Sequence, residues 1–150
     1  MEIILAENHG FCYGVKRAVE MANEAADSDG KSYTLGPIIH NPQVVGRLES
    51  KGVSPIQEVS DIDEGTMIIR SHGVGPAIYE EAEEKGLNIL DATCPHVKKA
   101  QQDAKSVIED GMTLVILGEK NHPEVKSINL WANNKGIIIE DEESAKNLQV

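Results

Sequence analysis

The sequence predicts an α/β fold in which parallel sheets are flanked by helices. Strand-like and helix-like segments alternate along almost the whole chain, prolines begin several of the predicted helices, and glycines follow their ends. This alternation is typical of parallel sheets with right-handed crossover connections. The 150 residues, 40% hydrophobic and 26% charged, suffice for one ordinary domain or for two small ones.

The first part of the chain is predicted to form one complete α/β unit. It begins with a buried strand at 3–5, and a helix follows whose apolar positions recur at helical spacing from Val15 to Ala26. The next predicted elements are a strand at 33–35, a helix capped by Asn41 that begins at Pro42 and ends at 51–52, a strand at 66–69, a helix at 76–85 and a strand at 87–90.

The second part is predicted to form an incomplete unit of the same kind. Its elements are a long helix from Pro95 to Gly111, a strand at 112–117, a helix that begins at Pro123, a strand at 136–139 and a helix at 142–148. We therefore divide the chain into a first α/β unit at 1–92 and a second at 93–150. Because the second unit looks truncated, we expect the chain to be the N-terminal portion of a longer protein.

Charge and hydropathy narrow the range of partners. The formal net charge of −11 argues against nucleic-acid binding, which needs a basic surface, but an anionic small molecule can still be held by local donors. No stretch approaches the roughly 20 apolar residues of a membrane span, and the apolar run at 3–6 is too short for a signal peptide. We expect a cytoplasmic protein with no membrane partner.

Both cysteines stand just before predicted helices. Cys12 lies between Gly10 and Gly14, and Cys94 directly precedes Pro95. A thiol at a helix N-terminus is shifted toward the thiolate, which is the form that binds metal or acts as a nucleophile. The alternative is that each is a small buried apolar residue. Their wide separation in the chain does not fit a zinc knuckle.

Histidines recur in a weak internal repeat. Three times a predicted strand ends in a polar turn, presents a histidine and is followed by a proline that begins a helix; the histidines are His40, His72 and His122. Ligands bind at this edge of an open α/β sheet. Three imidazoles there could bind a diphosphate, although each could instead be a loop or capping residue. No P-loop sequence supports nucleotide hydrolysis.

Glu124 follows His122 and Pro123 near the start of a predicted helix. Its carboxylate could simply favour the helix macrodipole, an effect of about 0.3–1 kcal/mol. It could also deliver a proton to a bound ligand. The residues alone leave both interpretations open.

Taken together, these motifs resemble one family. The segments are 10–15 with Arg17 and Ala18, His40-Asn41, 70–73, 91–95 and 122–124. In order and spacing they are similar to 4-hydroxy-3-methylbut-2-enyl diphosphate reductase, along essentially the whole chain. The resemblance implies an iron–sulfur reductase that acts in the last step of the non-mevalonate isoprenoid route. Such an enzyme removes the hydroxyl of an allylic diphosphate to give isopentenyl and dimethylallyl diphosphates.

The resemblance also implies roles for matching residues. Cys12 and Cys94 would be two of three thiolate ligands of a [4Fe–4S] cluster, whose fourth iron is left for the substrate hydroxyl. His40 and His72 would bind the diphosphate, with His122 as a further donor. Glu124 would help to protonate the leaving hydroxyl. Ferredoxin or flavodoxin would supply the two electrons.

The match stops before several family features. The third cluster cysteine, a threonine pair and a Ser-x-Asn diphosphate motif have no counterpart in these 150 residues, and the family fold has three α/β units. We therefore expect this chain to need a C-terminal half, in the same or another chain, for activity. Two other hypotheses remain: a cluster-free diphosphate-binding module, and a thiol switch that joins Cys12 to Cys94 by a disulfide.

Overall fold

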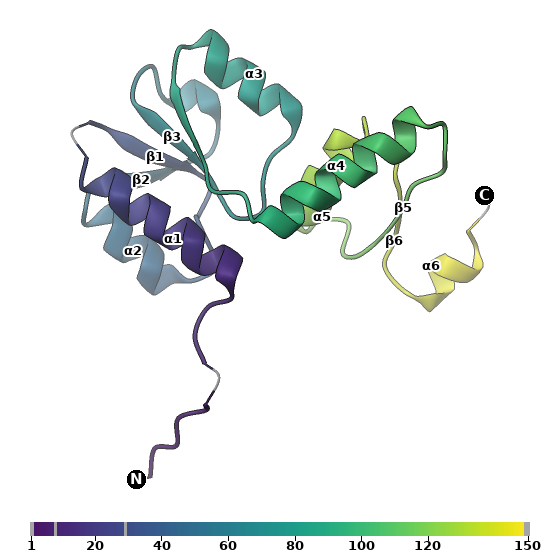
Figure 1. The fold of residues 1–150 in the computed structure, drawn as a ribbon, viewed down its shortest axis with the longest axis horizontal. Helices are drawn as coiled ribbons and strands as arrows, with labels where there is room; N and C mark the ends of the chain where they lie inside the picture. The colour runs from purple at the N-terminus through teal and green to yellow at the C-terminus, as the bar shows by residue number, and fades with distance from the viewer. Residues whose placement is uncertain (1, 8, 29, 149–150) are drawn as a thin grey trace.

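The computed structural model describes residues 2–7, 9–28 and 30–148 and confirms the α/β class (Figure 1). Its first elements are α1 (Tyr13–Ala26), β1 (Ser32–Leu35), α2 (Pro42–Glu49), β2 (Val53–Ile56), the 3-10 helix η1 (Val59–Asp61), β3 (Thr66–Ile69), α3 (Pro76–Glu84) and β4 (Asn88–Asp91). The others are α4 (Pro95–Glu109), β5 (Val115–Leu117), α5 (Pro123–Trp131), β6 (Ile137–Ile139) and α6 (Glu142–Lys146).

The first sheet is doubly wound. Its four strands run in the order β2-β1-β3-β4, and every neighbouring pair is parallel. After β1 the chain adds β2 on one side, then returns to add β3 and β4 on the other. The order reverses between β1 and β3, and ligand crevices of open α/β sheets form at such a point, beyond the carboxyl ends of the strands.

Both faces of this sheet are covered. Met67, Ile68 and Ile69 of β3 are all 0% exposed, although successive side chains of a strand point to opposite faces. Ile68 packs in a core with α1 and α2, while Met67 and Ile69 pack in a second core with η1 and α3. Figure 1 shows α1 and α2 on one side of the sheet and α3 on the other. Continuous apolar strands such as β3 are expected where both faces are buried.

The second sheet is smaller and lies beside α4 and α5 (Figure 1). It consists of the parallel strands β5 and β6. Leu117 of β5 remains 74% exposed and Val115 is 36% exposed. One side of this sheet is therefore only partly covered by the described residues. Across the ranges that the structure describes, no helix is both long and apolar enough to cross a membrane.

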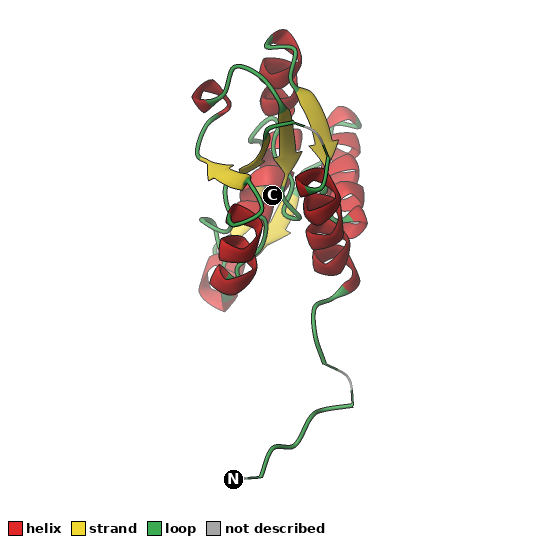
Figure 2. Ribbon diagram, turned by 90° about the vertical axis from the view of Figure 1, so that its left-hand side faces the viewer, coloured by secondary structure: helices red, strands yellow, loops and turns green. Residues whose placement is uncertain are grey.

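The strand predicted at 3–5 is wrong for this structure. Residues 2–7 and 9–12 extend away from the sheets without regular structure (Figure 2), and Ile3, Ile4 and Leu5 are 74%, 82% and 77% exposed. An apolar run becomes a strand only when a neighbouring strand offers its hydrogen-bonding edge. In the described ranges, no strand pairs with this run.

Two further differences concern strands. The strand β2 was not predicted. Its Pro55 argues against a central strand, and β2 lies at the sheet edge, where proline is tolerated. The strand predicted at 112–117 is confirmed only at Val115–Leu117. The other predicted helices and strands are confirmed to within a few residues of their ends, and Gly52, Gly86 and Gly111 follow helices with positive φ, as helix-ending glycines do.

Candidate functional site

Two of the three repeat histidines follow the strands that flank the switch point. His40 follows β1, and the Asn41 side chain next to it accepts a hydrogen bond from Val44 N at 3.0 Å, which caps α2. His72 follows β3. The third, His122, follows β5 in the second sheet and is the N-cap of α5. The predicted repeat of strand, histidine and helix is thus present in the fold.

The loop that carries His72 makes a tight turn. Gly73 N donates to Arg70 O at 3.0 Å, and Gly73 has φ of +70°, a backbone conformation that favours glycine. A Cβ at this position would also collide with the Gln101 side chain of α4. The positive φ therefore favours glycine beside His72, and the close approach of Gln101 adds to that preference.

Helix α5 is fastened to the same loop. Ser127 Oγ donates to the carbonyl oxygen of His72 at 2.7 Å, and Trp131 Nε1 donates to the carbonyl oxygen of Val74 at 2.9 Å. Gln101 Nε2 of α4 donates to Ser127 Oγ at 3.3 Å. These contacts hold the second sheet and its helices against the end of β3, and they bring the α5 N-terminus to the switch point.

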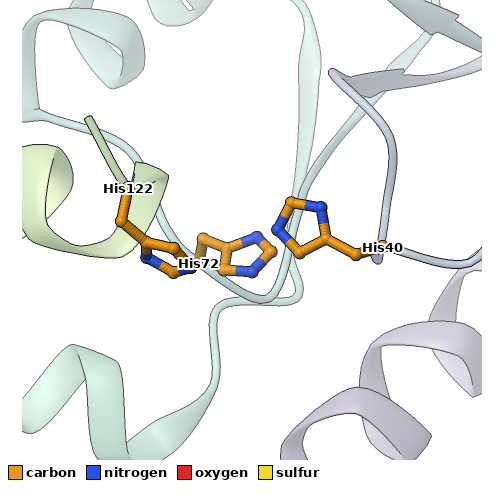
Figure 3. Close-up of side chains that lie close together, drawn as sticks. All are labelled: His40, His72 and His122. Carbon is orange, nitrogen blue, oxygen red and sulfur yellow. The ribbon is translucent and has the colours of Figure 1, made fainter. Parts of the chain in front are cut away.

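As a result, three imidazoles from different parts of the chain meet (Figure 3). The ring centroids of His40 and His72 are 4.7 Å apart, those of His72 and His122 5.6 Å, and those of His40 and His122 6.1 Å. One nitrogen from each ring lies within 4.8 Å of the others. Since these residues are far apart in sequence, the fold itself creates this three-histidine cluster.

The cluster is polar and poorly satisfied. Burial, followed by repulsion from His40, Arg70 and His122, lowers the pKa of His72 to about 4, so this ring is neutral at pH 7. Its Nδ1 is buried and has no hydrogen-bond partner within the described part of the chain. A buried polar atom without a partner is costly, so a ligand that pairs with Nδ1 would be favoured here.

The tautomer of His122 helps to identify that ligand. Glu124 N donates to His122 Nδ1 at 3.2 Å. The hydrogen of the neutral His122 ring must therefore be on Nε2, which becomes a donor. A metal-binding histidine instead uses one nitrogen for the metal and donates from the other. The arrangement of His122 favours an anion over a metal ion.

Cys94 lies against the first turn of the helix that Cys12 caps. Cys12 is the N-cap of α1 and Cys94 that of α4, and neither side chain makes a capping hydrogen bond. A Cβ on Gly14, in the first turn of α1, would lie only 2.5 Å from Cys94 Sγ. Both thiols are free, and Cys12 is exposed.

The cysteine region and the three-histidine cluster are adjacent. Cys94 N donates to the carbonyl oxygen of Ser71 at 2.9 Å, directly beside His72. A cavity of about 190 Å³ is lined by Phe11, the neighbour of Cys12, and by side chains that include His40 and His72. The loops of Cys12, His40, His72 and Cys94 therefore border one region of the molecule.

Glu124 lies at the edge of this region. It is partly buried, and its backbone N–H faces His122. Its carboxylate makes no hydrogen bond or ion pair with the described residues. This position is compatible with either interpretation of the sequence, helix stabilisation or proton delivery.

The supporting residues were not predicted. Ser127, Gln101 and Trp131 fix the relative positions of the histidines through contacts between separate units of the fold. A sequence signal exists only for Gln101 and Ser127, which are polar residues at inward-facing positions of amphipathic helices and are each 2% exposed.

The chain matches a protein family and its members over almost its full length. The family model described as LytB protein matches residues 3–150. A protein of Geotalea uraniireducens named 4-hydroxy-3-methylbut-2-enyl diphosphate reductase is 52% identical over 147 residues, which cover 97% of this chain and 52% of the relative. A protein of the same name from Caldanaerobacter subterraneus is 49% identical over 153 residues and is covered to 53%.

Solved structures of reductases also match this chain. A structure of (E)-4-hydroxy-3-methyl-but-2-enyl diphosphate reductase, the terminal enzyme of the non-mevalonate pathway, is 48% identical and has a TM-score of 0.83; the match covers 97% of this chain and 53% of that one. The E-1-hydroxy-2-methyl-but-2-enyl-4-diphosphate reductase from Plasmodium falciparum is 32% identical, with a TM-score of 0.91 and coverage of 96% and 46%. The chain spans about half the length of the curated relatives it matches, and it belongs to the LytB family.

Proposed function

We propose that this chain forms part of the active site of a reductase that removes the hydroxyl of 4-hydroxy-3-methylbut-2-enyl diphosphate to give isopentenyl and dimethylallyl diphosphates. The observation that carries the proposal is the meeting of His40, His72 and His122 beside two cysteines that cap helices. Membership of the LytB family supports the reaction. The division of the chain into units at 1–92 and 93–150, inferred from the sequence pattern, remains a proposal.

The three-histidine cluster binds the diphosphate of the substrate. His122 Nε2–H is a donor, as argued above, and the unpartnered Nδ1 of His72 can gain a partner when an anion binds. A bound anion also favours protonation of His72, because opposite charge raises the pKa of an imidazole. A tetrahedral zinc ion, with Zn–N of about 2.1 Å, would need nitrogens closer than about 3.5 Å, less than the 4.8 Å spread observed.

Cys12 and Cys94 are proposed ligands of a [4Fe–4S] cluster. Both thiols are free and lie at adjacent helix N-termini. Gly14, in the first turn of α1, has no side chain to fill the space beside Cys94 Sγ, and this arrangement fits a bulky thiolate-bound group. The sequence contains no other cysteine, so a further ligand must come from outside these 150 residues. When bound, such a cluster supplies electrons and a Lewis-acidic iron.

Glu124 is proposed to deliver the proton that lets the hydroxyl leave as water. It follows His122 by two residues, so a diphosphate on His122 lies near the start of α5. Its carboxylate is free of other partners among the described residues and could turn toward such a substrate.

Two partners complete the proposed enzyme. A C-terminal part like that of the relatives would supply the remaining cluster ligand and cover apolar surface, including Ile3–Leu5 and Leu117. Ferredoxin or flavodoxin would be the electron donor, which remains an expectation from the family resemblance.

Pyrophosphate binding tests the histidine part of this proposal. Isothermal titration calorimetry of the chain should show binding that weakens about tenfold in His40→Asn and in His122→Asn, since one charge-assisted hydrogen bond contributes about 1.5–3 kcal/mol. His96→Asn, an exposed histidine of α4 outside the cluster, is the matched control and should bind like the parent. Equal binding by all three variants would contradict the proposal.

Anaerobic reconstitution with iron and sulfide tests the cysteine part. The chain should bind iron and gain visible absorbance, and Cys12→Ser or Cys94→Ser should each reduce both. If pyrophosphate binds equally after both cysteines are replaced while no iron binds to the parent chain, the cluster-free binding module is the better description. Loss of both free thiols on mild oxidation, without iron binding, would instead support the thiol switch.

A further inference from the structure

A second cavity lies beside the loop that follows β3. It has a volume of about 330 Å³, within the range of small-ligand pockets. The end of β1, the Gly73–Gly75 loop and α5 form its walls. None of the three clustered histidines lines it, although their neighbours Gly73, Asn121 and Pro123 do, so the cavity borders the three-histidine cluster without including its imidazoles.

The charged groups of this cavity are all cationic. Arg70 and Lys126 line it together with Gln57, Asn121 and Ser127, and its lining includes no carboxylate. In the part of the chain that the structure describes, neither Arg70 nor Lys126 forms an ion pair. This lack of counter-charge is unusual in a chain whose net charge is −11.

Arg70 is the most informative of these residues. Its Nε is buried without a hydrogen-bond partner among the described residues, and burial lowers the pKa of the guanidinium. The guanidinium lies against Gly36, where a Cβ would stand 2.8 Å from Nη1, so glycine leaves room for it. Buried cations normally have a paired anion, and a planar guanidinium suits phosphate or carboxylate oxygens best.

We propose that this cavity is a second anion-binding site that takes a phosphate group, either as inorganic phosphate or as the phosphate of a small ester. Arg70 supplies a half-buried charge, Lys126 a second cation from α5, and Asn121 an exposed neutral donor. The site does not depend on the proposed function of the three-histidine cluster.

The test is calorimetric titration of the 150-residue chain with inorganic phosphate and, separately, with glycerol 3-phosphate. Arg70→Met should weaken phosphate binding at this site at least tenfold, and Lys126→Ala about threefold, while His96→Asn, an exposed histidine of α4, should leave it unchanged. Because Lys126 is exposed, Lys126→Ala tests the site even if Arg70→Met fails to fold. Tighter binding of the ester than of phosphate would identify an ester site, and the reverse a site for the free ion.

Arginine Nε–H signals give an independent readout. The chain has three arginines, Arg17, Arg47 and Arg70, and phosphate should shift only the signal that disappears in Arg70→Met. Unchanged phosphate affinity in both cavity variants, or loss of binding in His40→Asn alone, would overturn the proposal. Pyrophosphate binding to the histidines would still have its own test, so the two proposals can fail separately.

Discussion

The two sheets of this chain differ in how completely they are buried. In the first, β3 is 0% exposed at Met67, Ile68 and Ile69, because helices cover both faces. In the second, Leu117 of β5 is 74% exposed. The difference indicates that the first sheet holds its own core, whereas Ile116 is the only buried residue in the two strands of the second.

The candidate site lies where these unequal regions meet. His40 and His72 belong to the well-buried first region, but His122 belongs to the second and reaches them through Ser127 and Trp131. The site therefore depends on the less buried region for one of its three imidazoles. Binding and stability should respond differently to changes on the two sides.

The largest expected effect tests the difference in burial. Ile68→Ala should lower the free energy of unfolding by about 2–5 kcal/mol, since it leaves a cavity in a packed core. Leu117→Ala on the second sheet should change it by no more than about 0.5 kcal/mol, because that side chain is already exposed. Urea denaturation followed by circular dichroism measures both, and equal losses would break the comparison.

The next effect concerns the contact between the regions. Ser127→Ala removes the donor to the carbonyl oxygen of His72 and should lower the free energy of unfolding by about 1–3 kcal/mol. Because His122 is then less well held, pyrophosphate binding should weaken by up to about tenfold, which calorimetry can measure. Ser106→Ala, an exposed serine of α4, is the control. If Ser127→Ala binds as the parent does, α5 is held in place by other contacts.

Local signals explain which elements could be predicted from sequence. The helices that begin at Pro42, Pro76, Pro95 and Pro123 carry their own start signal, so their positions followed from the residues. The apolar run at 3–5 looked like a strand but has no partner among the described strands. Pairing between distant segments is what the sequence pattern cannot supply.

The same distinction applies to the site. The repeated strand, histidine and proline pattern predicted His40, His72 and His122, because parallel strands end at one edge of a sheet. The pattern could not predict Ser127, Trp131 or the unpaired Arg70, whose importance arises only from contacts between separate elements. Site residues that belong to a repeated local motif could be predicted from the sequence. Residues that matter only because separate elements pack together could not.

A smaller effect should appear in the pH dependence of stability. The pKa of His72, lowered to about 4, means that the folded state binds fewer protons than the unfolded state between pH 6.5 and 4. Stability should therefore fall as the pH decreases through this window, by about 1 kcal/mol once solvent screening of the half-buried ring is considered.

Urea denaturation at several pH values measures this dependence. His72→Asn should flatten the decrease below pH 6.5, whereas His96→Asn, on the exposed side of α4, should keep it. An unchanged slope in His72→Asn would show that other groups cause the acid sensitivity. Saturating pyrophosphate should reduce the slope in the parent chain, since the bound anion favours the protonated imidazole.

The smallest expected effect separates binding from chemistry at Glu124. Glu124→Gln keeps the shape of the side chain and removes a charge near the N-terminus of α5, so the free energy of unfolding should fall by about 0.3–1 kcal/mol. Pyrophosphate affinity should stay within about twofold, because the backbone N–H that orients His122 is retained. In an enzyme completed by a C-terminal part, turnover should collapse while the substrate still binds, because only proton delivery is lost. Normal turnover with the expected small loss of stability would leave Glu124 a helix-stabilising residue, and all of the site's chemistry would then rest on the histidines and cysteines.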